Sequence, residues 1–315
     1  MTYLIIAVLL TVALLFYFRI ADRYNIIDKP NDRSSHYSST VRGGGVIFPL
    51  AVLVWFLGPG AGAYVWFLLG LLLIATISFL DDLFSLPTFQ RIIVHLLSVA
   101  LLLYQTGFLE ETPYWTLLAI VLIIGWLNAF NFMDGINGIS AFYALVALAP
   151  LAYLNLQLNF TDSGIIHITG LALLIFSWFN ARRRARTFAG DVGSISLAFI
   201  IAFVMLQLLL ATERWEYIVF LGVYGVDAVC TIIHRLIRRE NIFQAHRSHL
   251  YQYLANEMVW PQLQVAGVYA LLQLGVSALI ISVNPSLAPL VAGGILLVLV
   301  ILYVVSKRYI MKISR

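Results

Sequence analysis

The feature that most constrains this chain is a succession of apolar runs, each close to the length of a membrane-spanning helix. We find eleven, at residues 2–18, 44–61, 63–80, 92–109, 115–131, 139–157, 164–180, 194–211, 216–235, 263–283 and 287–305. A helix of about 20 apolar residues crosses the hydrocarbon core of a bilayer. The sequence therefore predicts an all-α polytopic membrane protein with about eleven transmembrane helices, built as a single integral membrane domain over residues 1–315.

The composition supports the same class of protein. The chain is 62% hydrophobic and only 11% charged, whereas a soluble domain carries about 25% charged residues. The formal net charge of +4 does not indicate a nucleic-acid partner, because the Lys and Arg follow a membrane pattern. Cys230 is the single cysteine and lies in an apolar run, which excludes an intrachain disulfide and a cysteine-based metal site.

The distribution of Lys and Arg predicts the orientation in the membrane. They fall in alternate connections and in the C-terminal tail: Arg19, Arg23, Lys29, Arg33 and Arg42, then Arg91, then Arg182, Arg183, Arg184 and Arg186, then Arg235, Arg238, Arg239 and Arg247, and last Lys307, Arg308, Lys312 and Arg315. The remaining connections contain Arg214 and several acids. Since cytoplasmic loops are enriched in Lys and Arg, we expect the N-terminus outside and the C-terminus in the cytoplasm, in a multi-pass protein of a bacterial inner membrane.

Two adjacent acids, Asp81 and Asp82, follow the third apolar run directly. Neighbouring carboxylates repel each other, and burying either is costly. One interpretation is a base beside a cation or phosphate site. The other is a pair of solvated acids at the membrane interface.

A polar segment ends the fifth run, with the sequence Asn128-Ala-Phe-Asn131-Phe-Met-Asp134-Gly135-Ile-Asn137-Gly138. Asn128 and Asn131 lie one helical turn apart on one face, and the glycines break the helix and allow close approach of a ligand. Amide and carboxylate oxygens suit a hard cation such as Mg²⁺. The alternative is hydrogen bonding between helices.

The eighth run is preceded by Phe188-Ala-Gly190-Asp191-Val-Gly193-Ser194. We expect Ser194 to cap the helix that follows, and a helix N-terminus favours anions such as phosphate. Asp191 is then either a metal ligand or a favourable partner of the helix dipole.

The two longest predicted cytoplasmic loops, residues 19–43 and 236–262, contain further candidates. Arg247 and His249 in the second loop are suitable donors to a pyrophosphate, although a basic loop in contact with anionic lipid is an alternative. The first loop contains His36 and then Arg42, which is followed by three glycines. Glycines at a helix start fit an anion site or close helix packing.

Four polar residues inside the apolar runs are assigned no role. His95 and His167 are expected to be packed and hydrogen-bonded, whereas Asp227 and His234 share one face of the ninth run. We expect Asp227 to pair with an arginine near the cytoplasmic end. The five candidate segments described above all lie in cytoplasmic loops or at helix ends that enter them, which predicts one active site at the cytoplasmic face.

Together these segments resemble the polyprenyl-phosphate N-acetylhexosamine-1-phosphate transferases, also called glycosyltransferase family 4. The matching pieces are Asp81-Asp82, Asn128-x-x-Asn131-x-x-Asp134-Gly, Phe188-x-Gly190-Asp191-x-Gly193-Ser194 and Arg247-x-His249, in the family's order between about Asp28 and Gln252. Arg33-Ser-Ser-His36 and Arg42-Gly-Gly-Gly resemble the branch that initiates O-antigen and exopolysaccharide. The chain departs from the family's usual pattern at Ser85, Asn137, Tyr251 and Gln252.

The resemblance implies a role for each candidate residue. Asp81, supported by Asp82, would deprotonate or position a lipid phosphate, and Asp191 with Asn131 would bind Mg²⁺, with Mn²⁺ as the alternative ion. The implied substrate-binding residues are Asn137 at the uracil, Asn180 and Asp134 at the nucleotide, and Arg247 and His249 at the pyrophosphate, with Asn128, Arg42 and His36 as further candidates. The resemblance also implies a homodimer.

The implied reaction is the attack of undecaprenyl phosphate on the β-phosphorus of a UDP-sugar, with release of UMP. Such a reaction needs alignment and neutralisation of charge. A transporter of an anionic substrate, the alternative, would need ionisable groups near the membrane midplane, whereas these acids lie at helix ends. A non-catalytic scaffold has no need for this combination of motifs. The choice among GlcNAc, GalNAc and a 6-deoxy sugar is not visible in the sequence.

Overall fold

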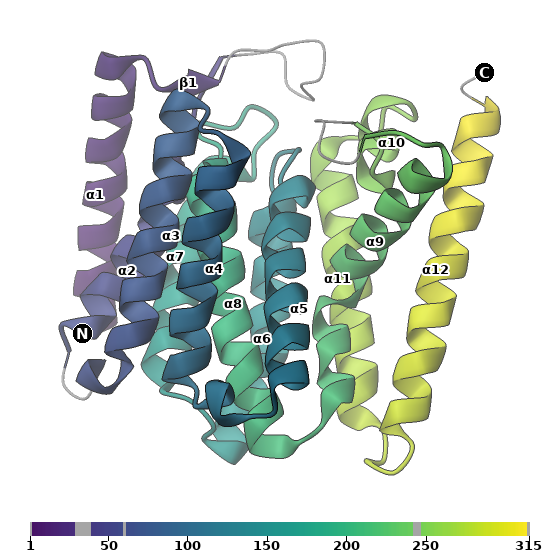
Figure 1. Cartoon of the computed structure of the whole chain (residues 1–315). Helices are drawn as coiled ribbons and strands as arrows, with labels where there is room; N and C mark the ends of the chain where they lie inside the picture. The colour runs from purple at the N-terminus through teal and green to yellow at the C-terminus, as the bar shows by residue number, and fades with distance from the viewer. Residues whose placement is uncertain (1, 29–38, 59–60, 242–246, 314–315) are drawn as a thin grey trace.

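The computed structural model describes residues 2–28, 39–58, 61–241 and 247–313, which form a bundle of helices (Figure 1). The long helices are α1 (Thr2–Tyr24), α3 (Val65–Phe84), α4 (Thr88–Gln105), α5 (Pro113–Met133), α6 (Ile139–Leu158), α7 (Ser163–Asn180), α8 (Gly190–Thr212), α9 (Gly222–Ile237), α11 (Gln262–Ser282) and α12 (Ala288–Ile313). The shorter elements are β1 (Ile27–Asp28), β2 (Thr40–Val41), η1 (Gly44–Val46), α2 (Ile47–Phe56), η2 (Ala61–Tyr64), η3 (Phe108–Glu110), η4 (Trp215–Leu221) and α10 (Leu250–Asn256).

Helix α8 forms the centre of the bundle. In its most apolar stretch 72% of the residues are buried, against 22% in α1 and 28% in α12. Figure 1 accordingly shows α1 and α12 at opposite edges. Because α8 begins with the Gly-Asp-x-Gly-Ser segment, the bundle places this segment among its neighbours and not at the rim.

The prediction of an all-α polytopic membrane protein is confirmed. Ten helices of the described residues are long and apolar enough to cross a membrane, one fewer than the eleven runs. The second run instead forms a short apolar helix over Gly44–Phe56. At 1.5 Å per residue its 13 residues reach only about 20 Å, less than the roughly 30 Å of a hydrocarbon core.

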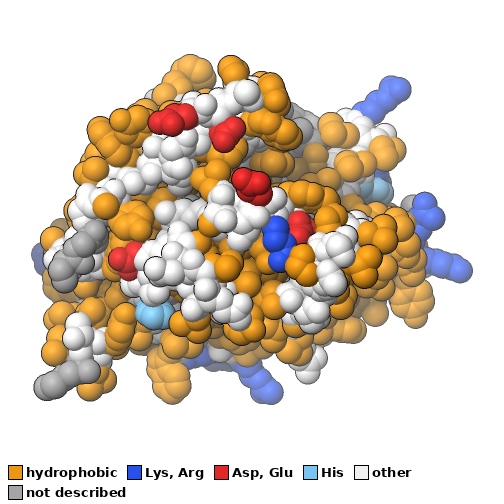
Figure 2. Space-filling model, turned by 90° about the horizontal axis from the view of Figure 1, so that it is seen from below, with side chains coloured by type: hydrophobic (Ala, Val, Ile, Leu, Met, Phe, Trp, Pro, Cys, Tyr) orange, Lys and Arg blue, Asp and Glu red, His pale blue; other side chains and the backbone are white. Residues whose placement is uncertain are grey.

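The two ends of the bundle differ in charge. We call the end that holds β1, α10 and the C-terminal end of α12 the cationic face, because the connections rich in Lys and Arg lie there (Figure 1). Figure 2 shows the opposite face, which is largely apolar, with acidic side chains spread over it and basic ones mainly at its margin. This asymmetry supports the predicted orientation, in which the cationic face is cytoplasmic.

The first loop packs along the segment that leads into α8. Val41 forms a parallel bridge with Thr187, and the amides of Gly44 and Gly45 donate to the carbonyl oxygens of Phe188 (2.9 Å) and Ala189 (3.0 Å). A Cβ added to Gly45 would lie 2.1 Å from the Cα of Gly193. Of the two interpretations of these glycines, the structure therefore supports close packing, since the amides of Gly44 and Gly45 are already bonded.

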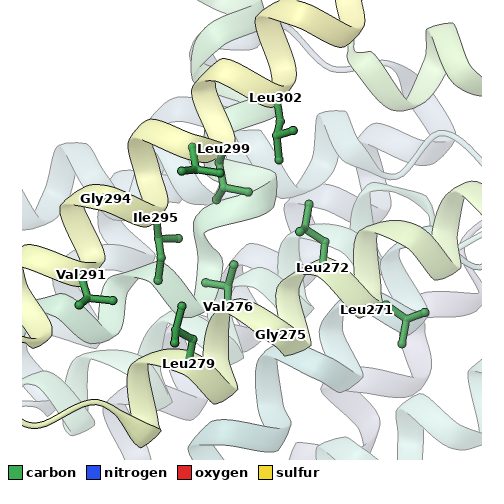
Figure 3. A pocket seen from close by; sticks show the side chains of 11 residues that line it. Leu271, Leu272, Gly275, Val276, Leu279, Val291, Gly294, Ile295, Leu299 and Leu302 are labelled. Atoms are coloured by element: carbon green, nitrogen blue, oxygen red, sulfur yellow. The ribbon is translucent and has the colours of Figure 1, made fainter.

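An apolar groove of about 560 Å³ lies between α11 and α12 (Figure 3). Gly275 and Gly294 leave it open, because nothing lies within 4 Å of a Cβ added to either residue. Its lining consists of Leu, Val, Ile and Gly side chains, which cannot bind a phosphate or a sugar by hydrogen bonds. The candidate catalytic site is therefore expected among the polar side chains at the cationic face.

Candidate active site

Asp82 holds the beginning of α8. Its carboxylate accepts hydrogen bonds from the backbone amides of Asp191 (2.9 Å) and Val192 (3.0 Å) and from Nε of Arg42 (2.7 Å). A side-chain oxygen on the first amides of a helix is the arrangement of an N-terminal cap, here supplied from another helix. The prediction that Ser194 caps α8 is wrong, because the helix already begins at Gly190 and the Ser194 hydroxyl donates to Asn131.

Asp81 faces a different set of partners. It accepts hydrogen bonds from the amide of Leu86 (2.6 Å) and from Nη1 of Arg91 (2.6 Å). Both acids are at most 9% exposed, so the interpretation of a solvated pair at the interface is wrong. Their charges are instead compensated by one arginine each.

Asp191 lies between the same two arginines. Its carboxylate is 3.9 Å from Nη2 of Arg42 and 3.8 Å from Nη1 of Arg91. Its side chain keeps 20% of its surface exposed, against 9% for Asp81 and none for Asp82. Asp191 is therefore the most accessible carboxylate of the acidic cluster, the name used below for Asp81, Asp82 and Asp191.

Arg42 belongs to this cluster and not to a separate anion site. Burial lowers its pKa, but the negative charges of Asp82 and Asp191 outweigh burial and raise the pKa above the usual value. The guanidinium therefore stays charged and links the first loop to the ends of α3 and α8. His36, the other candidate in this loop, lies outside the described residues.

The polar segment that forms the end of α5 and the turn after it is linked at two points to the acidic cluster and the start of α8. Asn131 accepts a hydrogen bond of 2.7 Å from the Ser194 hydroxyl, which joins α5 to the first turn of α8. Burial raises the pKa of Asp134 to about 6; the Ser140 side chain opposes this shift, and the charge of Asp82 adds to it. Asn128 instead donates to the carbonyl oxygen of Ile124 in its own helix (2.8 Å).

Asn137 and Asn180 fasten neighbouring loops to each other. Asn180 accepts from the amide of Gly138 and donates to the carbonyl oxygen of Thr187, both at 2.9 Å. Asn137 donates to the carbonyl oxygen of Arg182 (2.9 Å) and is 5% exposed. The two amides thus hold the α5–α6 turn against the connection between α7 and α8.

The Arg247-x-His249 motif lies where α10 begins. His249 is 1% exposed and its Nδ1 is 3.2 Å from Oδ1 of Asp227. The prediction that Asp227 pairs with an arginine is therefore wrong, because the side chain that faces it from α10 is His249. Arg247 lies close enough to Tyr251 for its charge to lower the pKa of that phenol, against the larger opposite effect of burial.

The residues present fit a magnesium ion that is completed by substrate. Within residues 2–28, 39–58, 61–241 and 247–313, no group of three His, Cys, Asp or Glu side chains is arranged to hold a metal by itself. Magnesium, however, needs only one or two carboxylates when waters and substrate phosphates supply the other oxygens. Asp191, which is partly exposed between two arginines, and the amide oxygen of Asn131 are oxygen donors of that kind.

Three residues of this region were not predicted from the sequence. In the sequence, Arg91 contributes only to the charge distribution, although its position nine residues after Asp82 places it in the same turn region. Asp227 stands alone in an apolar run, and Tyr251 marks only a departure from the family's pattern. The available signal for Asp227 was its charge inside an apolar helix, where an ionisable group is a functional candidate.

Fold and site together define a polytopic membrane protein with an arginine-bridged acidic cluster at its cationic face. Residues 64–209, which contain Asp81, Asp134 and Asp191, match the sequence model described as "Glycosyl transferase family 4". Over these residues the chain is similar to this family, and the matched part contains most of the acidic cluster's surroundings.

Several named relatives are similar to between about half and three quarters of the chain. A "Probable undecaprenyl-phosphate N-acetylglucosaminyl 1-phosphate transferase" of Bacillus subtilis is 26% identical, covering 75% of this chain and 71% of the relative. A phospho-N-acetylmuramoyl-pentapeptide-transferase of Thermotoga neapolitana is also 26% identical, over 70% and 74%. A putative UDP-N-acetylglucosamine–dolichyl-phosphate N-acetylglucosaminephosphotransferase of Sulfolobus acidocaldarius is 32% identical over 46% and 49%.

Proposed function

We propose that this protein transfers an N-acetylhexosamine-1-phosphate from a UDP-sugar to undecaprenyl phosphate at the cytoplasmic face of a bacterial inner membrane. The observation that carries the proposal is the position of Asp191, at the start of the central helix and between Arg42 and Arg91. This arrangement combines an accessible carboxylate with cationic groups, as a phosphoryl transfer between two anions requires.

The reaction forms one phosphorus–oxygen bond and breaks another. An oxygen of the lipid phosphate attacks the β-phosphorus of the UDP-sugar, and the bond to the bridging oxygen breaks, so that UMP leaves with the electron pair. Arg42 and Arg91 would neutralise charge on the phosphates. Asp81 is the candidate for positioning the lipid phosphate, whereas Asp82 maintains the start of α8.

Asp191 and Asn131 would hold Mg²⁺, or Mn²⁺ in its place. A divalent ion between phosphate oxygens supplies neutralisation of developing charge. Asp134, Asn137 and Asn180 would shape the nucleotide pocket through the α5–α6 turn, and Arg247 with His249 would bind the pyrophosphate. We also propose that Asn128, Arg42 and His36 contact the substrates.

The product would be the first lipid-linked intermediate of O-antigen or another cell-surface polysaccharide. The short similarity of the first loop to that branch supports this pathway, and the relative from Bacillus subtilis supports a GlcNAc-type sugar. A homodimer in the membrane is part of the proposal. The opposing function, transport of an anionic substrate, is disfavoured because the acidic cluster lies at helix ends.

The proposal is tested with the purified protein in detergent, undecaprenyl phosphate, Mg²⁺ and a panel of UDP-N-acetylhexosamines. We expect release of UMP that requires lipid and metal and that Asp191→Asn abolishes. The sugar that supports the fastest release would identify the donor. A folded protein that releases no UMP from any donor, yet moves an anionic substrate across liposomes, would establish the transporter instead.

A further inference from the structure

Asp227 is a buried carboxylate on which three helices converge. It lies in α9 and is 2% exposed. One oxygen accepts from Thr231 (3.2 Å), from the amide of Leu250 (3.1 Å) and from Nδ1 of His249 (3.2 Å). The other accepts from the Tyr269 hydroxyl (2.6 Å) and the amide of Tyr251 (3.4 Å).

These contacts determine the state of the His249 ring. A carboxylate only accepts hydrogen bonds, so Nδ1 of His249 must be a donor. In a histidine the bond made by one ring nitrogen sets the proton and the orientation of the other. Asp227 therefore controls both the tautomer and the direction of His249.

Tyr251 links the start of α10, which Asp227 holds, to the C-terminal end of α5. Its hydroxyl donates to the carbonyl oxygen of Phe132 (2.9 Å), two residues before Asp134. A Cβ added to Gly135 would lie 2.2 Å from that hydroxyl, so the contact requires glycine there. Burial raises the pKa of Tyr251 well above its usual value, and the charges of Asp227 and Asp134 add to this effect, which keeps the hydroxyl a donor.

The last helix is tied to the same loop. The Thr231 hydroxyl is 2.8 Å from the Tyr303 hydroxyl, and Nζ of Lys307 donates to Tyr303 (2.5 Å) and to the carbonyl oxygen of Ser248 (2.8 Å). The residue before His249 is therefore held from α12, while His249 itself is held from α9.

We infer that Asp227 is a positioning residue that acts through His249 and fixes the Arg247-x-His249 motif against the Asp134 end of α5. The inference rests on the proposed function, in which this motif binds the pyrophosphate. At metal sites, a carboxylate behind a ligating histidine raises its basicity and fixes its ring, and its loss lowers metal affinity or activity by about 10–100-fold; we expect an effect of the same order for a histidine that binds pyrophosphate. Asp227 itself touches no substrate in this arrangement.

The kinetic test is a double-mutant cycle of Asp227→Asn and His249→Gln, read as UMP release. We expect Asp227→Asn to lower kcat by about 10–100-fold with a smaller change in KM, and the double variant to be no slower than His249→Gln alone. A purely structural role predicts instead that the two effects multiply, and that result would overturn the inference. Tyr269→Phe, which removes another donor from the same carboxylate, measures the effect of altered packing.

A second measurement does not depend on activity. With ¹⁵N-labelled histidine, the His249 signals among the six histidines are identified by their loss in His249→Gln. We expect a protonated Nδ1 in the native protein and a changed Nδ1 signal in Asp227→Asn, or in Asp227→Glu if the first variant does not fold. Unchanged signals in a folded Asp227 variant would reject the pair. An inactive native protein with the expected signals would reject only the proposed function.

Discussion

Asp81 and Asp82 are adjacent in the sequence but have separate tasks in the structure. Asp82 uses both oxygens on Arg42 and on the first amides of α8. Asp81 accepts from Arg91, which also lies 3.8 Å from Asp191. The pair therefore connects two arginines to a single accessible acid.

Arg91→Gln tests the importance of this connection. We expect UMP release to fall by about 100-fold, the typical effect of removing a group that stabilises developing charge. The rate of UMP release by Arg91→Lys should lie between those of Arg91→Gln and the native protein, because lysine keeps the charge and loses the fork geometry. Arg308→Gln, at an exposed position on α12, is the control. Activity of Arg91→Gln within twofold of the native protein would remove Arg91 from the site.

Asp134 predicts a dependence on pH. Burial raises its pKa to about 6, so the carboxylate that we propose for the nucleotide site is mainly ionised only above that pH. We expect activity to fall as the pH drops through about 6. A profile that stays flat between pH 5 and 7 would contradict an essential ionised Asp134.

The raised pKa of Asp134 affects stability in the opposite direction from activity. Because the folded state raises the pKa, it favours the neutral acid, and this contribution is lost as the pH rises through about 6. Asp134→Asn resembles the neutral acid, so it should raise the melting temperature more at pH 8 than at pH 5 while it lowers activity. An equal change of melting temperature at both pH values would show that the carboxyl is not perturbed.

At the residue scale, the sequence predicted those residues whose own motif carries a signal. Asp81, Asp82, Asn131, Asp134 and Asp191 all stand in polar segments at helix ends, and the structure brings the acids and Asn131 to one region. Asp227 and Tyr251 could not be assigned, because their partners lie far away in the sequence, whereas Arg91 lies only ten residues from its partner Asp81 but belongs to no motif. Asp227, for instance, contacts His249 across 22 residues and Tyr269 across 42.

Among the elements, the start of α8 depends on its close crossing with η1. The Cβ of an alanine at position 45 would overlap the Cα of Gly193, and backbone atoms cannot move aside as a flexible side chain does. Overpacking of this kind costs about 1–3 kcal/mol or more. A displacement of the start of α8 that relieves this overlap would also move Asp191.

Gly45→Ala is therefore expected to lower the melting temperature by several degrees and to reduce UMP release. Gly275→Ala, in α11 where nothing lies within 4 Å of the added Cβ, is the matched control and should lower neither. Thermal unfolding in detergent and the UMP assay measure both properties. A native-like Gly45→Ala would show that the crossing tolerates a methyl group.

The elements differ in how visible they are in the sequence. The long helices follow from length and hydropathy, because one such run leaves no alternative inside a bilayer. The two strands and α10 are short and depend on tertiary partners: β2 continues into the bridge with Thr187, and Asp227 accepts from the first amides of α10. No local sequence pattern indicates such distant partners.

Over the whole molecule, the charge asymmetry predicts which face meets the cytoplasm. Cysteines are introduced at exposed positions, Glu111→Cys on the apolar face and Arg184→Cys on the cationic face, with Cys230→Ser as background. A membrane-impermeant maleimide should label Glu111→Cys in intact cells and Arg184→Cys only after permeabilisation. The reverse labelling would invert the orientation and place the acidic cluster outside.

The contact between Asp82 and α8 also has a consequence for biosynthesis. The amides of Asp191 and Val192 follow Asp82 by 109 and 110 residues, so at 5–20 residues per second they leave the ribosome roughly 5–20 s later. Arg42, only 40 residues earlier in the chain, is already present. Arg42 is thus the partner that can neutralise Asp82 in the nascent protein, before α8, the helix that Asp82 caps, has been translated.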